Sequence, residues 1–234
     1  MFDPDTIERY ITSKEASLSD AAARTYRPNL RRVARAVAPT LQPPSPTKQR
    51  RARSKLPYSD IEVEGLIRLA DNQRTQTRCR RLLTLLCLGL GAGLQPGEYQ
   101  DLRDEDVFCR DRVVYVAVGG RRVRVIPVLE PYGKSLLKLS VVIPDAYLLG
   151  GAEHGDRRNS VHNVLNNVVG AGSLPVIELG RLRATWMTHH IQHLGLDAFL
   201  AGAGIDNSYA IFDLVAFLPP AAPSRVASFL KGKA

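Results

Sequence analysis

The chain of 234 residues is long enough to bury a sizeable core and to form one domain or two small ones. Its 32 Lys and Arg residues outnumber 23 Asp and Glu, and the net charge of +9 favours a polyanionic partner over a membrane, unless the basic surface is merely solvated. Cys79, Cys87 and Cys109 lack C-x-x-C spacing, so neither a disulfide framework nor a zinc site is expected. The odd number and the spacing of these cysteines favour a reducing cytoplasm. No basic-then-apolar leader and no apolar run of membrane-spanning length is recognised, so neither secretion nor a membrane span is expected.

Residues 4 to 38 are predicted to form helices. The first apolar face comprises Ile7, Tyr10 and Ile11, and the second comprises Tyr26, Leu30, Val33 and Val37. Pro28 suits the first turn of the second helix, where its missing N–H costs nothing. Basic residues recur along one side of this helix, at Arg24, Arg27, Arg31 and Arg35. This stripe is either a solvated face or a surface that lies along DNA phosphates.

Residues 39 to 55 are predicted to form a linker. Four prolines stop helix formation, and five basic residues follow: Lys48, Arg50, Arg51, Arg53 and Lys55. Such a segment buries too little apolar surface to fold alone.

The second domain begins with a predicted helix. Ser59-Asp60-Ile61-Glu62 has the capping-box pattern, which predicts a helix N-terminus at Ser59. A further helix from about Gln76 to Leu90 becomes almost entirely apolar, so we expect it at the centre of the core. Two β-branched-rich runs, 112–118 and 122–128, flank Gly119-Gly120 and predict a hairpin.

The rest of the chain is predicted to be mostly helical. The expected helices cover residues 132–139, 160–169 (capped by Ser160), 179–194, 197–203 and 207–217, with a weak helix in the tail 221–234.

Three motifs in this order resemble those of the tyrosine recombinases, the phage integrase family. They are Gly93-Leu94-Gln95-Pro96-Gly97-Glu98, the hairpin ending in Ile126-Pro127-Val128, and Leu182-Arg183-x-Thr185-Trp186. The resemblance covers the chain from about Ile7 to Leu218. It implies a mainly α fold with a small β-hairpin or sheet, in which a short helical core-binding-like domain precedes a tyrosine-recombinase-like catalytic domain. The implied boundaries are 1–38 for the core-binding-like domain, 39–55 for the Pro-rich basic linker, 56–218 for the integrase-like domain and 219–234 for the tail.

The resemblance also identifies six positions that carry strand cleavage in the family. In the family's order of arginine, lysine, histidine, arginine, histidine or tryptophan, and tyrosine, this chain has Gln95, Gly119, Gly180, Arg183, Ile205 and Leu214. Only Arg183 matches, and the loss of a single preorganised donor costs about a hundred- to a thousand-fold in rate. We therefore expect a degenerate, inactive member, with no catalytic residues, no cofactor and no enzymatic activity.

The expected function is sequence-specific binding of double-stranded DNA. The protein would be a regulator or repressor of transcription in a phage or mobile element, or an accessory to recombination. It would be associated with the nucleoid. The candidate DNA contacts are Arg24, Arg27, Arg31, Arg35, Arg50, Arg51, Arg53, Arg121, Arg122, Arg124, Arg181 and Arg183. Arg183 is expected to bind phosphate or, alternatively, to brace its helix through a carboxylate such as Glu98. The family resemblance implies a strand-like linker that closes around DNA, whereas a flexible tether is the alternative.

Two alternatives to this expected function stay open. In the first, the chain is an active recombinase with a relocated nucleophile, for which Tyr209 is the candidate. In the second, it is a module that binds an active recombinase. His189, His190 and His193 cluster on one predicted helix, but no matching carboxylates accompany them, so no metal site is expected. The tail is a candidate surface for homo-oligomer formation.

Overall fold

The computed structural model describes residues 4–14, 20–39, 55–120, 122–140, 147–150, 157–205 and 209–231. The chain divides into two compact units, Met1–Arg53 and Ser54–Ala234. No helix in the described ranges is both long and apolar enough to cross a membrane.

Unit 1 is a pair of helices, α1 (Pro4–Ser13) and α2 (Asp20–Val37). Ile7 and Ile11 of α1 are buried against Leu30 and Ala34 of α2. This contact confirms the first apolar face, because both residues lie one turn apart on the side that meets α2.

The apolar face predicted for α2 is wrong in part. Tyr26, Val33 and Val37 are about half exposed, at 51%, 48% and 60%. Arg27 instead lies buried and pairs with Glu8 of α1 at 2.9 Å, so the face of α2 that meets α1 is partly ionic. Pro28 lies inside the 18-residue α2 rather than in its first turn. It is exposed there, where a proline removes one backbone hydrogen bond but need not disturb the packing.

Unit 2 is mostly helical with one small sheet, which confirms the predicted fold class. Its helices are α3 (Asp60–Asp71), α4 (Gln76–Ala92), α5 (Glu130–Ser140), α6 (Ser160–Asn166), α7 (Leu179–Ile191), α8 (Leu196–Ala203), α9 (Tyr209–Val215) and α10 (Pro223–Leu230). Short 3-10 helices cover Pro96–Glu98 and Asp104–Asp106.

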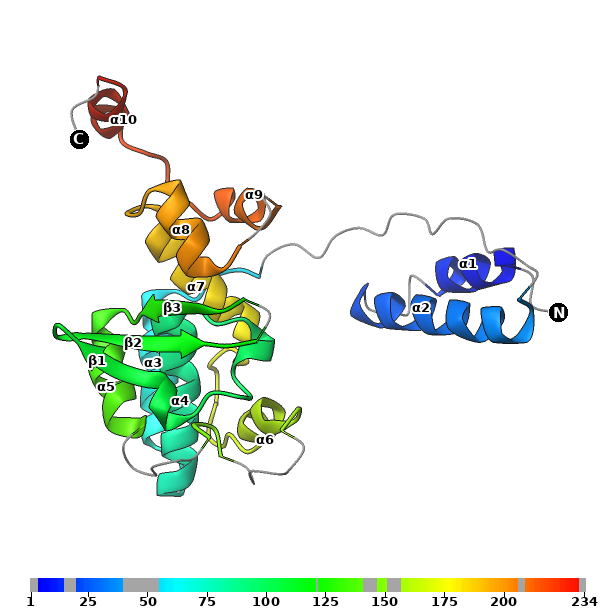
Figure 1. Ribbon diagram of the computed structural model, residues 1–234, viewed down its shortest axis with the longest axis horizontal. Helices are drawn as coiled ribbons and strands as arrows, with labels where there is room; N and C mark the ends of the chain where they lie inside the picture. The colour runs from blue at the N-terminus through cyan, green and yellow to red at the C-terminus, as the bar shows by residue number, and fades with distance from the viewer. Residues whose placement is uncertain are drawn as a thin grey trace. The chain divides into compact units, whose positions relative to one another are not determined.

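Helix α4 lies at the centre of unit 2, as its apolar composition predicts. It packs against α3, α5, α6 and α7, and Figure 1 shows it inside this group of helices. Every residue from Thr84 to Ala92 is buried. A helix that is apolar on all sides must be covered on all sides, so the other helices assemble around it.

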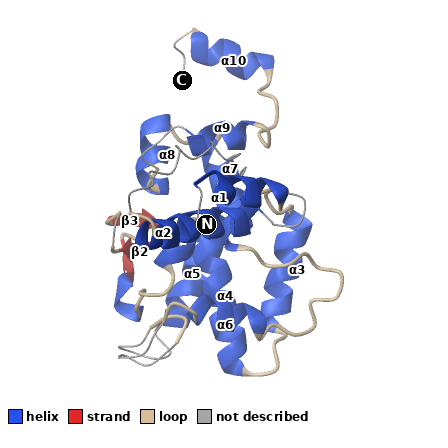
Figure 2. Ribbon diagram, turned by 90° about the vertical axis from the view of Figure 1, so that its right-hand side faces the viewer, coloured by secondary structure: helices blue, strands red, loops and turns tan. Residues whose placement is uncertain are grey.

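The sheet is three-stranded and antiparallel, in the order β1 (Val107–Arg110), β2 (Val113–Val118) and β3 (Arg124–Pro127). The β2–β3 pair is the predicted hairpin, with Val116 opposite Ile126. Strand β1 was not predicted, because its four residues show no clear alternation. The strands lie on one side of the helices (Figure 2), and α5 packs against β1 and β2.

Local sequence signals explain where several helices begin and end. Ser59 and Glu62 form the predicted capping box, since Glu62 N donates to Ser59 Oγ and Ser59 N donates to Glu62 Oε2. Helix α4 ends at Gly93, which adopts a left-handed conformation with φ of 59°. A Cβ at Gly93 would also collide with the ring of Trp186, so both the backbone conformation and the close packing require glycine at this position. The cap of α6 is Asn159 rather than the predicted Ser160.

Candidate nucleic-acid interface

A hollow of about 470 Å³ lies between the end of α4 and the β2–β3 turn. Its lining includes Gln95, Gly119, Gly120 and Arg122, together with the carboxylates of Glu98, Asp101 and Asp106. A Cβ at either glycine would meet no atom within 4 Å, so this turn leaves the hollow open. The fold therefore brings together Gln95 and Gly119, two of the six positions identified by the resemblance, although they lie 24 residues apart in the sequence.

Arg183 projects from α7 toward the ends of two other helices. Its Nη1 donates to the carbonyl of Gly93, and its Nη2 donates to the carbonyl of Ala203 at 2.5 Å. The C-terminal carbonyls of a helix carry partial negative charge and favour a cation. Arg183 therefore ties the ends of α4 and α8 together. The alternative prediction that Arg183 braces its helix through the carboxylate of Glu98 is wrong, because Arg183 donates to main-chain carbonyls instead.

Glu98 is instead the partner of Arg124, a residue of β3. Arg124 Nη1 lies 2.6 Å from Oε1 and Nη2 lies 3.0 Å from Oε2, a bidentate ion pair in which both side chains are largely buried. Arg124 Nε also donates to Gly202 of α8 at 3.2 Å. Arg122 Nη1 donates to the carbonyl of Gly204, the residue that ends α8. Arg122 of the β2–β3 turn, Arg124 of β3 and Arg183 of α7 thus converge on the last turn of α8.

Burial and charge together set the protonation of this cluster. Burial lowers the pKa of Arg183 to about 10, although the neighbouring carboxylate of Glu98 opposes this shift. Burial by itself raises the pKa of Glu98, but hydrogen bonds from Arg124 and from the Gln95 N–H bring it below its ordinary value. At neutral pH both groups are charged, so the cations Arg124 and Arg183 act on one buried carboxylate, that of Glu98.

The other three family positions serve the packing of unit 2. Gly180 lies against the aliphatic part of the Lys55 side chain, because a Cβ added at Gly180 would be 3.3 Å from Lys55 Cγ. Lys55 also pairs with Glu178 at 2.8 Å. Ile205 is partly buried against the core, and Leu214 is completely buried. The side chain of Tyr209, the candidate for a relocated nucleophile, lies outside the described residues.

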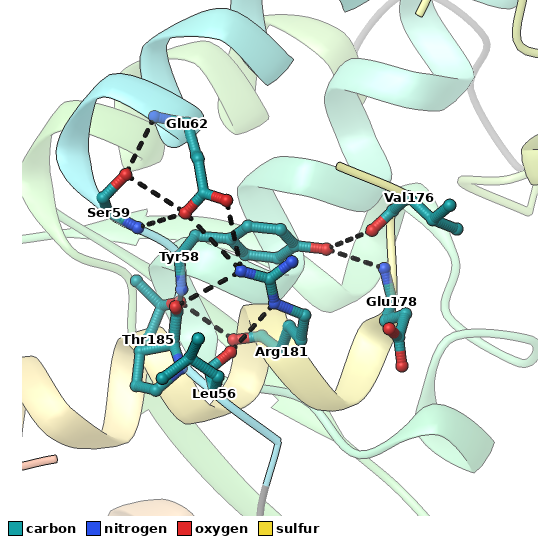
Figure 3. Close-up of polar contacts among 9 residues, drawn as sticks. Leu56, Tyr58, Ser59, Glu62, Val176, Glu178, Arg181 and Thr185 are labelled. Carbon is teal, nitrogen blue, oxygen red and sulfur yellow. Dashed lines mark hydrogen bonds and ion pairs between the residues drawn. The ribbon is translucent and has the colours of Figure 1, made fainter. Parts of the chain in front are cut away.

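Arg181 belongs to a separate polar cluster that the sequence did not reveal (Figure 3). Its guanidinium lies 3.8 Å over the ring of Tyr58, its Nε donates to the Leu56 carbonyl at 2.9 Å, and its Nη2 lies 3.3 Å from Glu62 Oε1. The Tyr58 hydroxyl donates to the Val176 carbonyl at 2.7 Å and accepts from the Glu178 N–H at 2.9 Å. This cluster attaches the start of unit 2 to α7, so the structure gives Arg181 an intramolecular role.

The structure describes the side chains of only some of the remaining candidate DNA contacts. Arg27 and Arg31 of α2 both approach Glu8, at 2.9 and 3.4 Å, so they face α1. Arg35 is exposed, and its Nε donates to the Arg31 carbonyl at 3.4 Å. Arg50, Arg51, Arg53 and Arg121 lie outside the described residues, as does the side chain of Arg24. The predicted stripe along α2 is therefore not one continuous exposed face.

The three neighbouring histidines lie at the end of α7. The ring of His189 contacts those of His190 and His193, with centroids 5.1 and 5.5 Å apart. His190 also packs on Trp186, with centroids 4.6 Å apart. Among the described residues, no group of three or more His, Cys, Asp or Glu side chains is arranged to hold a metal ion.

Solved structures with similar folds identify this architecture. The XerH site-specific recombinase bound to its difH substrate, in a pre-cleavage complex, has a TM-score of 0.64 at 14% identity over 97% of this chain and 69% of that chain. The Tn1549 transposon integrase (aa 82–397) with circular intermediate DNA has a TM-score of 0.64 at 15% identity, covering 98% of this chain and 85% of that one. XerA recombinase has a TM-score of 0.52 at 18% identity, over 98% and 82%.

Comparisons of sequence add no relative to these. No protein-family model matches the chain, and no curated protein matches it. The structural neighbours nevertheless confirm the resemblance seen in the motifs: the chain has the fold of the tyrosine recombinases and integrases.

The same neighbours correct the expectation that the chain is not an enzyme. That expectation rested on five substituted positions, but the proteins that share this fold are site-specific recombinases and an integrase. The substitutions at Gln95, Gly119, Gly180, Ile205 and Leu214 describe the chain's departures from the family motif. They do not establish that it is inactive.

Proposed function

We propose that the chain binds double-stranded DNA, with a backbone phosphate in the hollow beside Arg122. The observation that carries the proposal is that Arg122 lines an open hollow and that the buried cations Arg124 and Arg183 lie beside it at the end of α8. The XerH and Tn1549 structures with similar folds are complexes with DNA. The net charge of +9 supplies the long-range attraction that a polyanion requires.

The three arginines differ in whether their side chains are accessible from the hollow. Arg122 lines the hollow, and we assign it direct contact with the phosphate. The side chain of Arg124 is only 9% exposed and already forms two bonds to Glu98, so it positions the hairpin. Arg183, also largely buried, contributes charge and holds α8 beside the hollow.

For the biological role, we propose occupancy of a specific DNA site by a transcriptional regulator or an accessory to recombination. Such a protein would be found on the nucleoid. Base recognition would then come from side chains that face the major groove, because phosphate contacts by themselves carry little sequence information.

We also propose that the C-terminal tail mediates homo-oligomer formation. Helix α10 lies beyond α8 and α9 in both views of the molecule (Figures 1 and 2). Phe212 and Val215 of α9 and Val226 of α10 are exposed, at 71%, 58% and 43%. Exposed apolar side chains on these two helices favour a protein partner, and a second copy would bury the same residues twice.

The test of DNA binding compares Arg122→Ala with Arg110→Ala. Both variants remove one positive charge, but Arg122 lies in the β2–β3 turn beside the hollow, whereas Arg110 is exposed on β1 and does not line the hollow. Affinity for a duplex selected from genomic fragments is measured by fluorescence anisotropy over a range of salt concentrations. Loss of one phosphate contact should lower the slope of log K against log salt by about 0.9 in Arg122→Ala. Arg110→Ala should retain the slope of the unmodified chain.

Two results would contradict the proposal. Absence of binding by the unmodified chain at physiological salt would remove the function itself. Equal changes of slope in the two variants would show a general effect of charge, with no phosphate held at the hollow.

A further inference from the structure

A second polar pocket, of about 260 Å³, lies between the N-terminal end of α4 and α6. Arg78 and Arg81 of α4 line one side, and Asn163 and Asn167 line the other. None of its lining residues carries a carboxylate. The pocket is smaller than a typical drug-sized site, so it suits a small ligand.

This pocket is distinct from the hollow beside Arg122. Helix α4 has 17 residues, and the hollow lies near its C-terminal end at Gly93. At 1.5 Å per residue, the two ends of α4 are about 25 Å apart. A phosphate held in one site therefore does not reach the other.

The two arginines of the pocket have few partners for their charge. Arg78 Nη2 donates to Asn167 Oδ1 at 3.3 Å, and neither Arg78 nor Arg81 forms an ion pair with another described residue. The Nε of Arg81 is buried and has no hydrogen-bond partner within the described ranges. Within the described ranges this N–H therefore lacks the acceptor that buried N–H groups normally have.

The guanidinium of Arg81 is also held in place. It lies against Gly150, where a Cβ would collide with it, and Gly150 has a φ of 80° that favours glycine. Its neighbour Arg80 is bonded to the Leu148 carbonyl at 3.0 Å. The pKa of Arg80 is lowered by burial and, to a smaller extent, by the charge on Arg81, so these cations repel one another. An anion would relieve that repulsion.

We propose that this pocket binds a phosphate group through Arg78 and Arg81. The two guanidinium groups match the several acceptor oxygens of phosphate, and the asparagine amides provide further donors. The start of α4 adds the partial positive charge of a helix N-terminus. The phosphate belongs either to a small phosphorylated compound or to a DNA backbone.

The test uses the full chain with the variants Arg81→Gln and Arg78→Gln. Arg74→Gln is the matched control, because Arg74 is exposed in the preceding loop and does not line the pocket. Inorganic phosphate and pyrophosphate are titrated calorimetrically at constant ionic strength, and a short duplex is titrated in parallel. Loss of one charge-assisted hydrogen bond should weaken binding about tenfold or more in each pocket variant. Arg74→Gln should bind like the unmodified chain.

The two sources of phosphate give different results. Binding of phosphate or pyrophosphate with one-to-one stoichiometry, weakened in both pocket variants, assigns the site to a small phosphorylated compound. If these probes do not bind but duplex affinity falls in both pocket variants, the site holds a DNA phosphate. Unchanged affinity for all probes, or an equal loss in Arg74→Gln, overturns the proposal. Because Arg122 is unaltered throughout, this outcome is separate from the test of DNA binding at the hollow.

Discussion

Replacing Arg183 by methionine should destabilise the protein strongly, because this arginine joins the ends of two helices. The substitution retains a long apolar stem but removes both hydrogen bonds to the Gly93 and Ala203 carbonyls. Hydrogen bonds that involve a charged group contribute about 1.5–3 kcal/mol each. Part of this sum is offset because methionine needs no desolvation of a buried cation. We therefore expect a net loss of about 3 kcal/mol.

Urea unfolding at neutral pH measures this loss, with Arg183→Lys and Arg110→Met as controls. Lysine keeps the charge but cannot present a planar fork to two carbonyls, so an intermediate loss of about 1–2 kcal/mol is expected. Arg110 is exposed on β1, and its replacement should change stability by no more than about 0.5 kcal/mol. In thermal unfolding, 3 kcal/mol corresponds to a decrease in Tm of about 6–12 °C for a domain of this size. A loss below about 1 kcal/mol for Arg183→Met would refute the assignment of Arg183 as a brace.

Two further predictions concern the units and the histidines. A fragment of residues 55–234 should bind duplex DNA at least about tenfold more weakly than the full chain if both units hold one duplex. Equal affinities in anisotropy titrations would show that residues 1–54 do not contribute. Burial, with the charges of His189 and His193, lowers the pKa of His190 from 6.5 to about 4. Between these pH values the unfolded chain takes up a proton that the folded chain does not, so stability falls as pH decreases from about 6.5 to 4. His190→Gln should make this decrease shallower in urea unfolding at pH 7, 5.5 and 4.5, whereas the exposed control His162→Gln should retain it. Parallel pH profiles for His190→Gln and the unmodified chain would contradict the buried, neutral state of His190.

Several elements could be predicted from local sequence because neighbouring residues specify them. The capping box of Ser59 and Glu62 closes within four residues, so it specifies the start of α3 without help from the rest of the chain. The apolar run that ends α4 requires burial on all sides, and α4 does lie at the centre of unit 2. Gly119-Gly120 between two β-branched runs predicts the β2–β3 turn. The order of these elements and of the short motifs was also sufficient to predict the fold.

The tertiary structure decided which partner each charged side chain has. From the sequence, four arginines are equally good candidates for DNA contacts: Arg122, Arg124, Arg181 and Arg183. In the fold, Arg124 meets a carboxylate 26 residues away, and Arg181 meets one 119 residues away. Arg183 reaches a carbonyl 90 residues away, and of these four arginines only Arg122 lines the open hollow. Helical and strand periodicity arise from bonds between near neighbours, whereas the partner of a long, flexible arginine depends on which distant carbonyl or carboxylate the packed helices bring within reach.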